Sequence, residues 1–392
     1  MNQGRSLFAQ IIECIPHPQL AGCIQRYRGN NRSRGFTCHD QLLCMAFAQM
    51  TFRDSLRDTV CSLRASGTTL YHLGIRGRVS RSTLADANEK RDWRIWSDLA
   101  QLLIDQARAL YADHPIGLRL RRTVYAFDST TIDLCTSLFP WALYKRRQHA
   151  IKLHTLLDLR GNIPVFLRIT AAKGHDVLAL DHLIIEAGAF YLIDRGYLDF
   201  ARLRRFTNAG AFFVTRGRKN FRFRRIESRP VNQAAAAAGI RCDQTIRLVS
   251  FYPRKGYPEP LRRIVVVDPE TGKRLTFLTN NFTLAATTIA QLYRQRWQVE
   301  LFFKWIKQYL RIKHFFGTSS NAVRTQVWIG VVVYVLLAIV KKRQEIAMTL
   351  SQMHTVLSVR AFEKTPIKQA FSEDVQTGED HENRKQLLLF NI

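Results

Sequence analysis

The fold is decided between residues 123 and 216, where five apolar segments follow one another: TVYAFD (123–128), IKLHTLLD (151–158), IPVFLRIT (163–170), FYLID (190–194) and AFFVTR (211–216). Each is short and rich in β-branched or aromatic residues, as is typical of strands in a sheet. Arg160-Gly161-Asn162 predicts a hairpin between the second and third segments. Helical patterns at 176–186 and 198–208 separate the later ones. This order predicts an α/β (α+β) fold in which a mixed sheet packs against helices.

The pattern changes outside this region. Residues 1–112 have apolar residues at helical spacing, and residues 217–274 contain strand-like pieces and an alanine run, which predicts a β-rich insertion. The sheet resumes at 275, and a long helix is predicted from about 284 to 310. We therefore expect a helical domain over 1–112, a core over 113–216 and 275–347, the insertion over 217–274, and a polar, finally acidic tail over 348–392.

The charge balance is strongly positive. The chain has 59 Lys and Arg against 31 Asp and Glu, a formal net charge of +28. Such an excess makes a polyanion the leading partner, with an anionic membrane as the rival. The apolar run Val327–Val340 is shorter than the roughly 20 residues that span a bilayer. It predicts a buried core helix, with a re-entrant segment as the alternative, and the N-terminus predicts no secretory signal.

The helical region and the cysteines give weaker signals. Arg76, Arg78 and Arg81 lie where short helices join, which suits a DNA-reading helix-turn-helix and equally an ordinary helical domain with a basic face. Seven cysteines without a CxxC pair fit a reducing cytosol. Cys38-His39 with Cys44 lacks the paired spacing of a zinc site, so buried free thiols are the simpler interpretation.

Two aspartates follow apolar strands. Asp128 and Asp194 each come at a predicted strand end, where open sheets place their chemistry. Converging there, their carboxylates would form an oxygen-rich site suited to Mg²⁺. Each aspartate is also a plausible turn opener in Asp-Ser-Thr or Asp-Arg-Gly.

The predicted long helix carries a third carboxylate. Tyr293, Arg296, Glu300 and Lys307 fall within an arc of roughly 60° at 100° per residue. An apolar stripe occupies the opposite side: Leu292, Val299, Phe303, Ile306 and Leu310. A solvated face with a Glu300–Lys304 pair explains the glutamate alone. It does not explain the tyrosine and arginine on the same line.

The spacing Tyr293-x2-Arg296-x3-Glu300-x6-Lys307 resembles the signature of the insertion-sequence-4 family of DDE transposases. AFDSTTIDL around Asp128 and LIDRGYLDF around Asp194 are similar to that family's first and second acidic motifs, in the same order. FTCHDQLLCMAFAQMTFRDSLRDTV resembles the helical domain ahead of the catalytic core in one branch. The resemblance covers roughly residues 30 to 345.

The resemblance implies an RNase H-like core that carries out cut-and-paste DNA transposition as a dimer bridging two element ends. It implies that Asp128, Asp194 and Glu300 hold two Mg²⁺ ions, with Mn²⁺ as a possible substitute. Tyr293, Arg296 and Lys307 would contact the DNA backbone. A structure-selective nuclease or resolvase on the same core, and a non-catalytic DNA-end-binding regulator, are the alternatives. The implied location is the bacterial cytoplasm, at the nucleoid.

Some assignments stay open. The basic stretch after the fifth strand predicts a track that binds the DNA backbone through Arg216, Arg218, Lys219, Arg222 and Arg224. The alternative is an exposed, solvated strand. Relatives use a tryptophan of the insertion for base flipping, and residues 217–274 contain none. Phe251, Tyr252 and Tyr257 are possible substitutes. Asp133 is an alternative first ligand, and Asp176 either lies near the site or caps a helix.

Overall fold

The computed structural model describes residues 4–31, 33, 35–67, 69–72, 74–75, 79–118, 120–135, 137–145, 148–218, 221–268, 272–309 and 315–372. The chain forms two compact units. Of the described residues, unit 1 comprises those within 4–113, 131–151 and 302–372, and unit 2 those within 114–130 and 152–301. Arg76, Arg78, Lys219, Leu310 and the acidic residues after 372 lie outside the described residues.

Unit 1 is built almost entirely of helices: α1 (Leu7–Ile12), α2 (His17–Arg26), α3 (Cys38–Met50), α4 (Leu56–Ala65), α5 (Thr69–His72), α6 (Arg81–Lys90), α7 (Arg94–Leu110), η1 (Pro140–Ala142), α13 (Ser320–Arg343), α14 (Leu350–Arg360) and α15 (Ile367–Ala370). Local sequence fixes their starts. Thr37 and Asp40 form a capping box at α3, in which the Thr37 hydroxyl accepts from the Asp40 N–H. The prediction of helices over 1–112 agrees with this arrangement.

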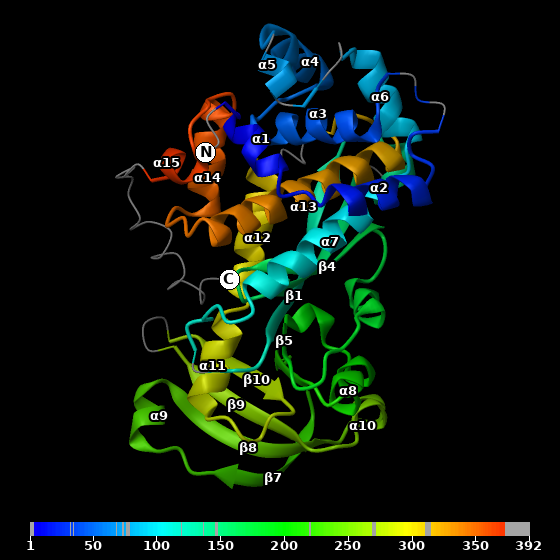
Figure 1. The fold of residues 1–392 in the computed structure, drawn as a ribbon. Coiled ribbons are helices and arrows are strands. Elements are labelled where there is room, and N and C mark those ends of the chain that lie inside the picture. Colours follow the sequence, from blue (N-terminus) through cyan, green and yellow to red (C-terminus); the bar gives the residue numbers. More distant parts are fainter. Residues whose placement is uncertain are drawn as a thin grey trace. The chain divides into compact units, whose positions relative to one another are not determined.

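Helix α13 is the core of unit 1. It lies between α3 and α7 (Figure 1) and contacts both. Among the described helices it is long and apolar enough to cross a membrane, but 89% of its apolar stretch is buried inside the protein. The Tyr111 hydroxyl donates to the Ala338 carbonyl at 2.9 Å, and Trp93 stacks on Trp328. The prediction of a buried core helix is confirmed.

Two predicted boundaries differ from the structure. Residues 302–347 were assigned to the sheet-bearing core, whereas the described residues of this segment belong to unit 1, because α13 buries its apolar surface against the N-terminal helices. The predicted tail begins too early. Residues 348–372 carry α14 and α15, which contact α1 and bury Met353, Leu357 and Ile367.

His354 makes the stability of unit 1 depend on pH. It is fully buried against Phe52, Trp305 and Tyr309. Burial lowers the pKa of its imidazole to about 4. The unfolded chain binds this proton near pH 6.5. We therefore expect stability that is present above pH 6.5 to be lost as the pH falls towards 4, by about 3 kcal/mol in total.

Urea denaturation between pH 7.5 and 4.5 measures this loss. His354→Phe keeps an aromatic ring in the same aromatic surroundings and should flatten the pH dependence by the amount that one histidine contributes. An equal pH dependence in the variant would assign the effect to other groups.

Unit 2 is organised by a sheet. Its order among the described strands is β2-β3-β1-β5-β6-β10-β9-β8-β7, with β4 also paired to β3. The strands are β1 (Val124–Leu134), β2 (Leu143–Lys145), β3 (Gln148–Asp158), β4 (Ile163–Ala171), β5 (Phe190–Ile193), β6 (Phe212–Arg216), β7 (Phe223–Arg229), β8 (Ile240–Leu248), β9 (Leu261–Val267) and β10 (Arg274–Thr279). β2 and the first residues of β3 belong to unit 1. Parallel pairs β1–β5–β6 adjoin antiparallel pairs β6–β10–β9–β8–β7, so the predicted mixed sheet is confirmed.

The predicted hairpin joins β3 and β4. Gly161 and Asn162 both have positive φ, of 77° and 56°. These two residues end the four-residue connection between Asp158 and Ile163. Glycine adopts positive φ without steric cost and asparagine tolerates it, which explains the Gly-Asn pair. The predicted helix 176–186 is shorter, a 3-10 turn named η2 (Asp176–His182). A second turn, η3 (Arg195–Tyr197), precedes α8 (Phe200–Asn208).

The insertion extends the sheet of unit 2. Strands β7, β8 and β9 continue the hydrogen-bond ladder of β6 and β10, and two short helices, α9 (Gln233–Ala237) and α10 (Phe251–Gly256), interrupt them. Arg262 on β9 is 3% exposed and forms two bonds to Asp243 on β8, at 2.8 and 2.6 Å. It also donates to the carbonyls of Asn281 and Leu284, ahead of the next helix. This buried pair ties the insertion to the segment that leads back to the core.

Candidate active site

Asp128 and Asp194 lie level on neighbouring strands. β1 and β5 pair in parallel up to Phe127 opposite Ile193, so the next residue on each strand is an aspartate. Paired strands lie roughly 5 Å apart. The Asp194 carboxylate accepts from the Gly196 N–H at 3.0 Å.

Only one of these two aspartates ends a strand. β5 stops at Ile193, as predicted, but β1 continues to Leu134, so the prediction that Asp128 ends its strand is wrong. Strand alternation places Asp133, five residues later, on the opposite face from Asp128. This favours Asp128 over Asp133 as the partner of Asp194.

The predicted helix 284–310 is two helices. α11 (Ala286–Arg294) and α12 (Trp297–Tyr309) are separated by Gln295 and Arg296. The N–H groups of these two residues bond three residues back, to Leu292 and Tyr293, in a tighter turn than an α-helix. The prediction of one continuous helix is therefore wrong, although Tyr293, Arg296 and Glu300 still line one cavity.

The break places Arg296 between two acids. Its Nη1 donates to Asp128 Oδ2 at 2.7 Å, and its Nη2 donates to Glu300 Oε1. The residue is 8% exposed. Thus one guanidinium joins the acid on β1 to the acid on α12.

Burial shapes the protonation of this group. It raises the pKa of Asp128 to about 6, against the opposing effect of Arg296, with Asp194 and Glu300 adding to the rise. Burial alone would lower the pKa of Arg296, but Tyr293 and the two bound carboxylates outweigh it and raise that pKa. Arg296 therefore stays charged, while burial disfavours the charged form of Asp128.

Tyr293 closes the other side of the site. It is 3% exposed, packs on Phe277 with ring centroids 4.8 Å apart, and donates weakly to Asp194 Oδ1 at 3.4 Å. Burial raises the pKa of its phenol. A tyrosine nucleophile needs an accessible hydroxyl with a lowered pKa, so the burial of Tyr293 disfavours a covalent mechanism through it.

The three acids line one cavity of about 270 Å³ within unit 2. Its other walls are cationic or apolar: Arg195, Arg216, Arg294, Arg296, Val266, Leu275, Phe277, Ala290, Tyr293 and Trp297. Carboxylates beside cations and an aromatic wall suit a ligand that carries phosphate and a flat apolar group. The sequence-based assignment missed Arg195, Arg294 and Trp297. Trp297 directly follows Arg296, but no pattern in the sequence marks the helix break at which α12 begins.

Lys307 and the basic stretch differ in placement. Lys307 lies on α12, seven residues after Glu300, in the part of that helix that belongs to unit 1. Arg216 ends β6 and lines the cavity. Arg218, Arg222 and Arg224 are exposed, and Lys219 lies outside the described residues.

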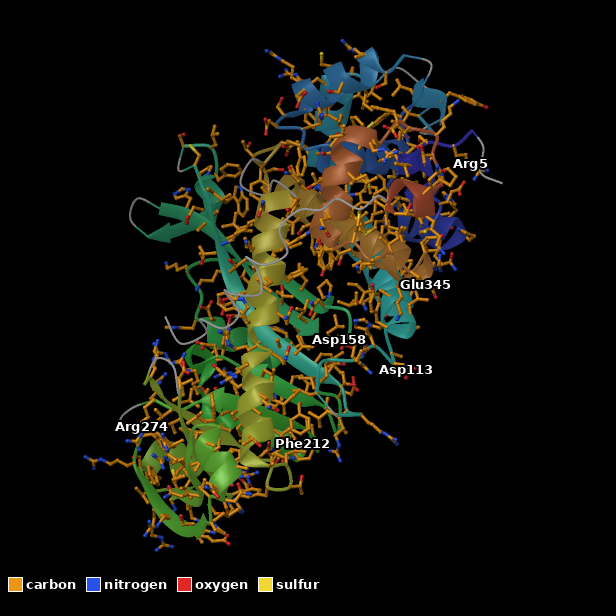
Figure 2. All side chains as sticks on the ribbon, turned by 90° about the vertical axis from the view of Figure 1, so that its left-hand side faces the viewer. Arg5, Asp113, Asp158, Phe212, Arg274 and Glu345 are labelled. Atoms are coloured by element: carbon orange, nitrogen blue, oxygen red, sulfur yellow. The ribbon has the colours of Figure 1, made fainter. Side chains whose placement is uncertain are left out.

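The phenylalanines of the basic stretch are not exposed beside its arginines. Phe221 and Phe223 pack against the core, and Arg263 lies over the Phe223 ring at 5.0 Å. Arg224 and Arg225 lie on β7, the last of the described strands in the sheet order, and both are exposed. Figure 2 shows nitrogen-tipped side chains projecting from unit 2 near the labelled Arg274, the first residue of β10.

The three base-flip candidates separate clearly. Phe251 and Tyr252, at the start of α10, are 72% and 81% exposed. Tyr257 is 1% exposed, and its hydroxyl bonds to that of Thr207 at 2.8 Å. The assignment of Tyr257 is corrected, because a base cannot reach a ring that α8 and α10 cover.

Asp176 belongs to a second charged group near the acids. It pairs with Lys152 on β3 at 2.7 Å, and it does not cap η2, whose N-cap residue is His175. Burial chiefly raises the pKa of Tyr197, and the charges of Asp128, Asp176 and Asp194 add to this rise. Asp176 thus lies within electrostatic range of the same phenol as the two strand aspartates.

The donor set fits a divalent cation by its chemistry, since three carboxylates line one cavity and hard oxygen ligands are those that Mg²⁺ prefers. Their present spacing is looser than a coordination shell. Among the described residues, no three His, Cys, Asp or Glu side chains are grouped closely enough to hold an ion. Arg296 lies between two of these acids and is paired with both Asp128 and Glu300.

Comparison with known proteins identifies the family. Residues 119–336 match the model described as the transposase DDE domain, and residues 3–76 match a domain of unknown function, DUF4372. A Sinorhizobium fredii protein named as a transposase, y4zB, is 34% identical over 72% of this chain and 78% of its own length.

Two further relatives carry insertion-sequence names. The one named for element IS5377 of Geobacillus stearothermophilus is 32% identical over 56% of this chain and 57% of its own length. The one named for element IS4SA of Synechocystis is 23% identical over 71% and 77%. The DDE-domain match spans more than half of the chain and contains all three acids, and so the chain belongs to the DDE transposases of insertion sequences, enzymes that cleave and join DNA.

Proposed function

We propose that Asp128, Asp194 and Glu300 are the catalytic acids of a cut-and-paste transposase. The observation that carries this proposal is their position on the walls of a single cavity, although they come from β1, β5 and α12. These acids would hold two Mg²⁺ ions, for which Mn²⁺ is a possible substitute. Bound ions of this kind lower the pKa of an attacking hydroxyl and stabilise a leaving oxygen.

The topology supports an RNase H-like core. The order β4-β3-β1-β5-β6, with β1, β5 and β6 parallel, is a five-strand arrangement with two acids at its centre. The insertion then enters after β6 and before the helix with the third acid. This agrees with the architecture that the sequence resemblance implies.

The cationic residues of the cavity would position the scissile phosphate. Arg296 presents a planar fork that matches two phosphate oxygens, and Arg216 adds a second charge at the end of β6. Lys307 would hold DNA farther along α12. Tyr293 would orient Asp194 or the backbone through its hydroxyl. A water or a 3′-hydroxyl then attacks phosphorus in line, and the bond to the leaving oxygen breaks.

The exposed arginines of the insertion would hold the DNA backbone, which predicts a salt effect. Arg222→Ala with Arg224→Ala should reduce the slope of log K against log[salt] by about two, one for each lost phosphate contact. Arg204→Ala is the matched control, because Arg204 is ion-paired with Glu259. A titration of labelled duplex between 50 and 300 mM salt measures the slopes. An unchanged slope in the double variant would remove these residues from the interface.

Phe251 and Tyr252 remain the candidates for base flipping. Their rings are mutually edge-on at 5.3 Å, and Arg254 and Lys255 follow them in α10. Stacking on such rings is favourable for any base. The apolar cavity wall with Trp297 offers a second surface for an extruded base. A homodimer bridging two element ends, DNA reading by residues 1–112 and action at the bacterial nucleoid complete the proposal.

A single assay tests the proposal against its alternatives. Labelled duplexes carrying the element ends are incubated with the full-length protein and Mg²⁺. Joined product is the outcome that a transposase predicts. Nicks without joining would support the nuclease, and shifted but intact DNA would support the regulator.

A further inference from the structure

We propose that Arg296 acts as an internal cation at the acid cluster, and that it leaves Asp128 and Glu300 when divalent metal binds. This inference rests on the proposed function of the three acids. It adds that the metal site is closed by a side chain of the protein, and that a phosphate of DNA is the partner that draws this side chain away.

The geometry of the fork is the first step. Arg296 uses its two terminal nitrogens on two different acids, Asp128 Oδ2 at 2.7 Å and Glu300 Oε1. These acids come from β1 and α12, so one guanidinium occupies an oxygen on each of two residues that would hold a metal. A carboxylate oxygen that accepts a short charged hydrogen bond from arginine is poorly placed to coordinate a metal at the same time.

Burial strengthens the competition between Arg296 and a metal ion for the two carboxylates. The Arg296 side chain is 9% exposed, against 19% for Asp128 and 27% for Glu300. In such a site the ion pairs are screened little by water, so the paired arrangement is strongly populated. A ligand that needs a minor conformation binds more weakly in proportion to its population. If the open arrangement is one-tenth populated, the apparent metal affinity falls about tenfold.

A phosphate bound in the same cavity would give Arg296 an alternative partner to the two acids. Arg195 and Arg216 line the same cavity, so a phosphate that enters meets several cations. Phosphate offers the guanidinium the same bidentate geometry that carboxylates do. DNA would therefore hold Arg296 away from the acids and raise their affinity for metal. By thermodynamic reciprocity, metal would raise the affinity for DNA by the same factor.

The test measures metal binding and not activity. Mn²⁺ is titrated calorimetrically into the full-length protein without DNA, comparing the parent with Arg296→Gln, Arg296→Lys and Arg216→Gln. Arg216→Gln removes one positive charge from the same cavity and controls for electrostatics alone. We expect Arg296→Gln to bind Mn²⁺ about tenfold more tightly than the parent, and Arg216→Gln to change the affinity less than threefold.

Arg296→Lys keeps the charge but lacks the two terminal nitrogens with which arginine reaches both acids. Its Mn²⁺ affinity should lie between those of Arg296→Gln and Arg216→Gln. It also guards against a folding defect in the glutamine variant, which circular dichroism would detect. Equal gains in Arg296→Gln and Arg216→Gln would overturn the inference, since only net charge would then matter. If Asp194→Asn nevertheless abolishes Mn²⁺ binding, the proposed metal site at the three acids is retained and only the displacement of Arg296 is rejected. If Asp194→Asn and Glu300→Gln bind Mn²⁺ like the parent, the proposed catalytic site itself fails.

Discussion

Glu300→Gln, Asp128→Asn and Asp194→Asn are each expected to lower the rate of DNA-end cleavage by on the order of 10³-fold. Each change removes a charged oxygen ligand while keeping nearly the same shape. The loss should affect both the nick and the joining step, because both use the same acids. DNA binding should change only a few-fold, since the acids make no attractive contact with phosphate.

The control for this prediction is Glu259→Gln. Glu259 lies in the same unit and pairs with Arg204 on the surface, at 2.8 Å. It should cleave DNA at the parental rate. Quantified nicked and joined products from labelled element ends, with gel shifts on the same samples, provide the measurement. Parental cleavage by Glu300→Gln would remove this residue from the set of acids.

Arg262→Met is expected to lower the free energy of unfolding by about 3–5 kcal/mol. The change leaves the Asp243 carboxylate buried without its main partner, and two carbonyls before α11 lose a donor. Chemical denaturation of the full-length protein measures the loss. DNA cleavage should fall as well, because residues 281–284 lead into the helix pair with Arg296 and Glu300.

Two variants sharpen this prediction. Arg229→Met removes the second, more exposed arginine of Asp243, which contacts it at 3.2 Å, and should cost no more than about 1 kcal/mol. The double change Asp243→Leu with Arg262→Met removes both charges of the fully buried pair and should recover part of the loss. If the double variant loses as much stability as the single variants Asp243→Leu and Arg262→Met together, the pairing of Asp243 with Arg262 is not what stabilises this part of the sheet.

The sequence predicted the elements whose patterns are local. The hairpin at Gly161-Asn162, strand β5 before Asp194 and the buried helix around Val327–Val340 follow from turn chemistry and apolar runs. The three acids line one cavity, but local patterns alone did not predict this, because Asp128 and Glu300 lie on elements whose extents were predicted wrongly. The expectation that they meet rested mainly on the family resemblance.

Features set by tertiary contacts were harder to predict. The break at Gln295-Arg296 has no glycine or proline, and helix periodicity continues through it. What sets this segment apart is the hydrogen bond from Arg296 to Asp128 on β1, which is a tertiary contact. β1 extends to Leu134 because its partner strands, not its own residues, set its length. Tyr257 resembled an exposed turn aromatic until its contact with Thr207 was known.

The shared ladder of β6, β10, β9, β8 and β7 limits how this enzyme can be re-engineered. A segment that forms its own globule can be exchanged between homologues like a cassette. Here, replacing residues 217–274 by a short linker would remove β9, the neighbour of β10. β10 would then be an unpaired edge strand, two strands from β5, which leads to Asp194. Chimaeras that aim to change end recognition should therefore keep β8 and β9 and graft only the loops and the outermost strand.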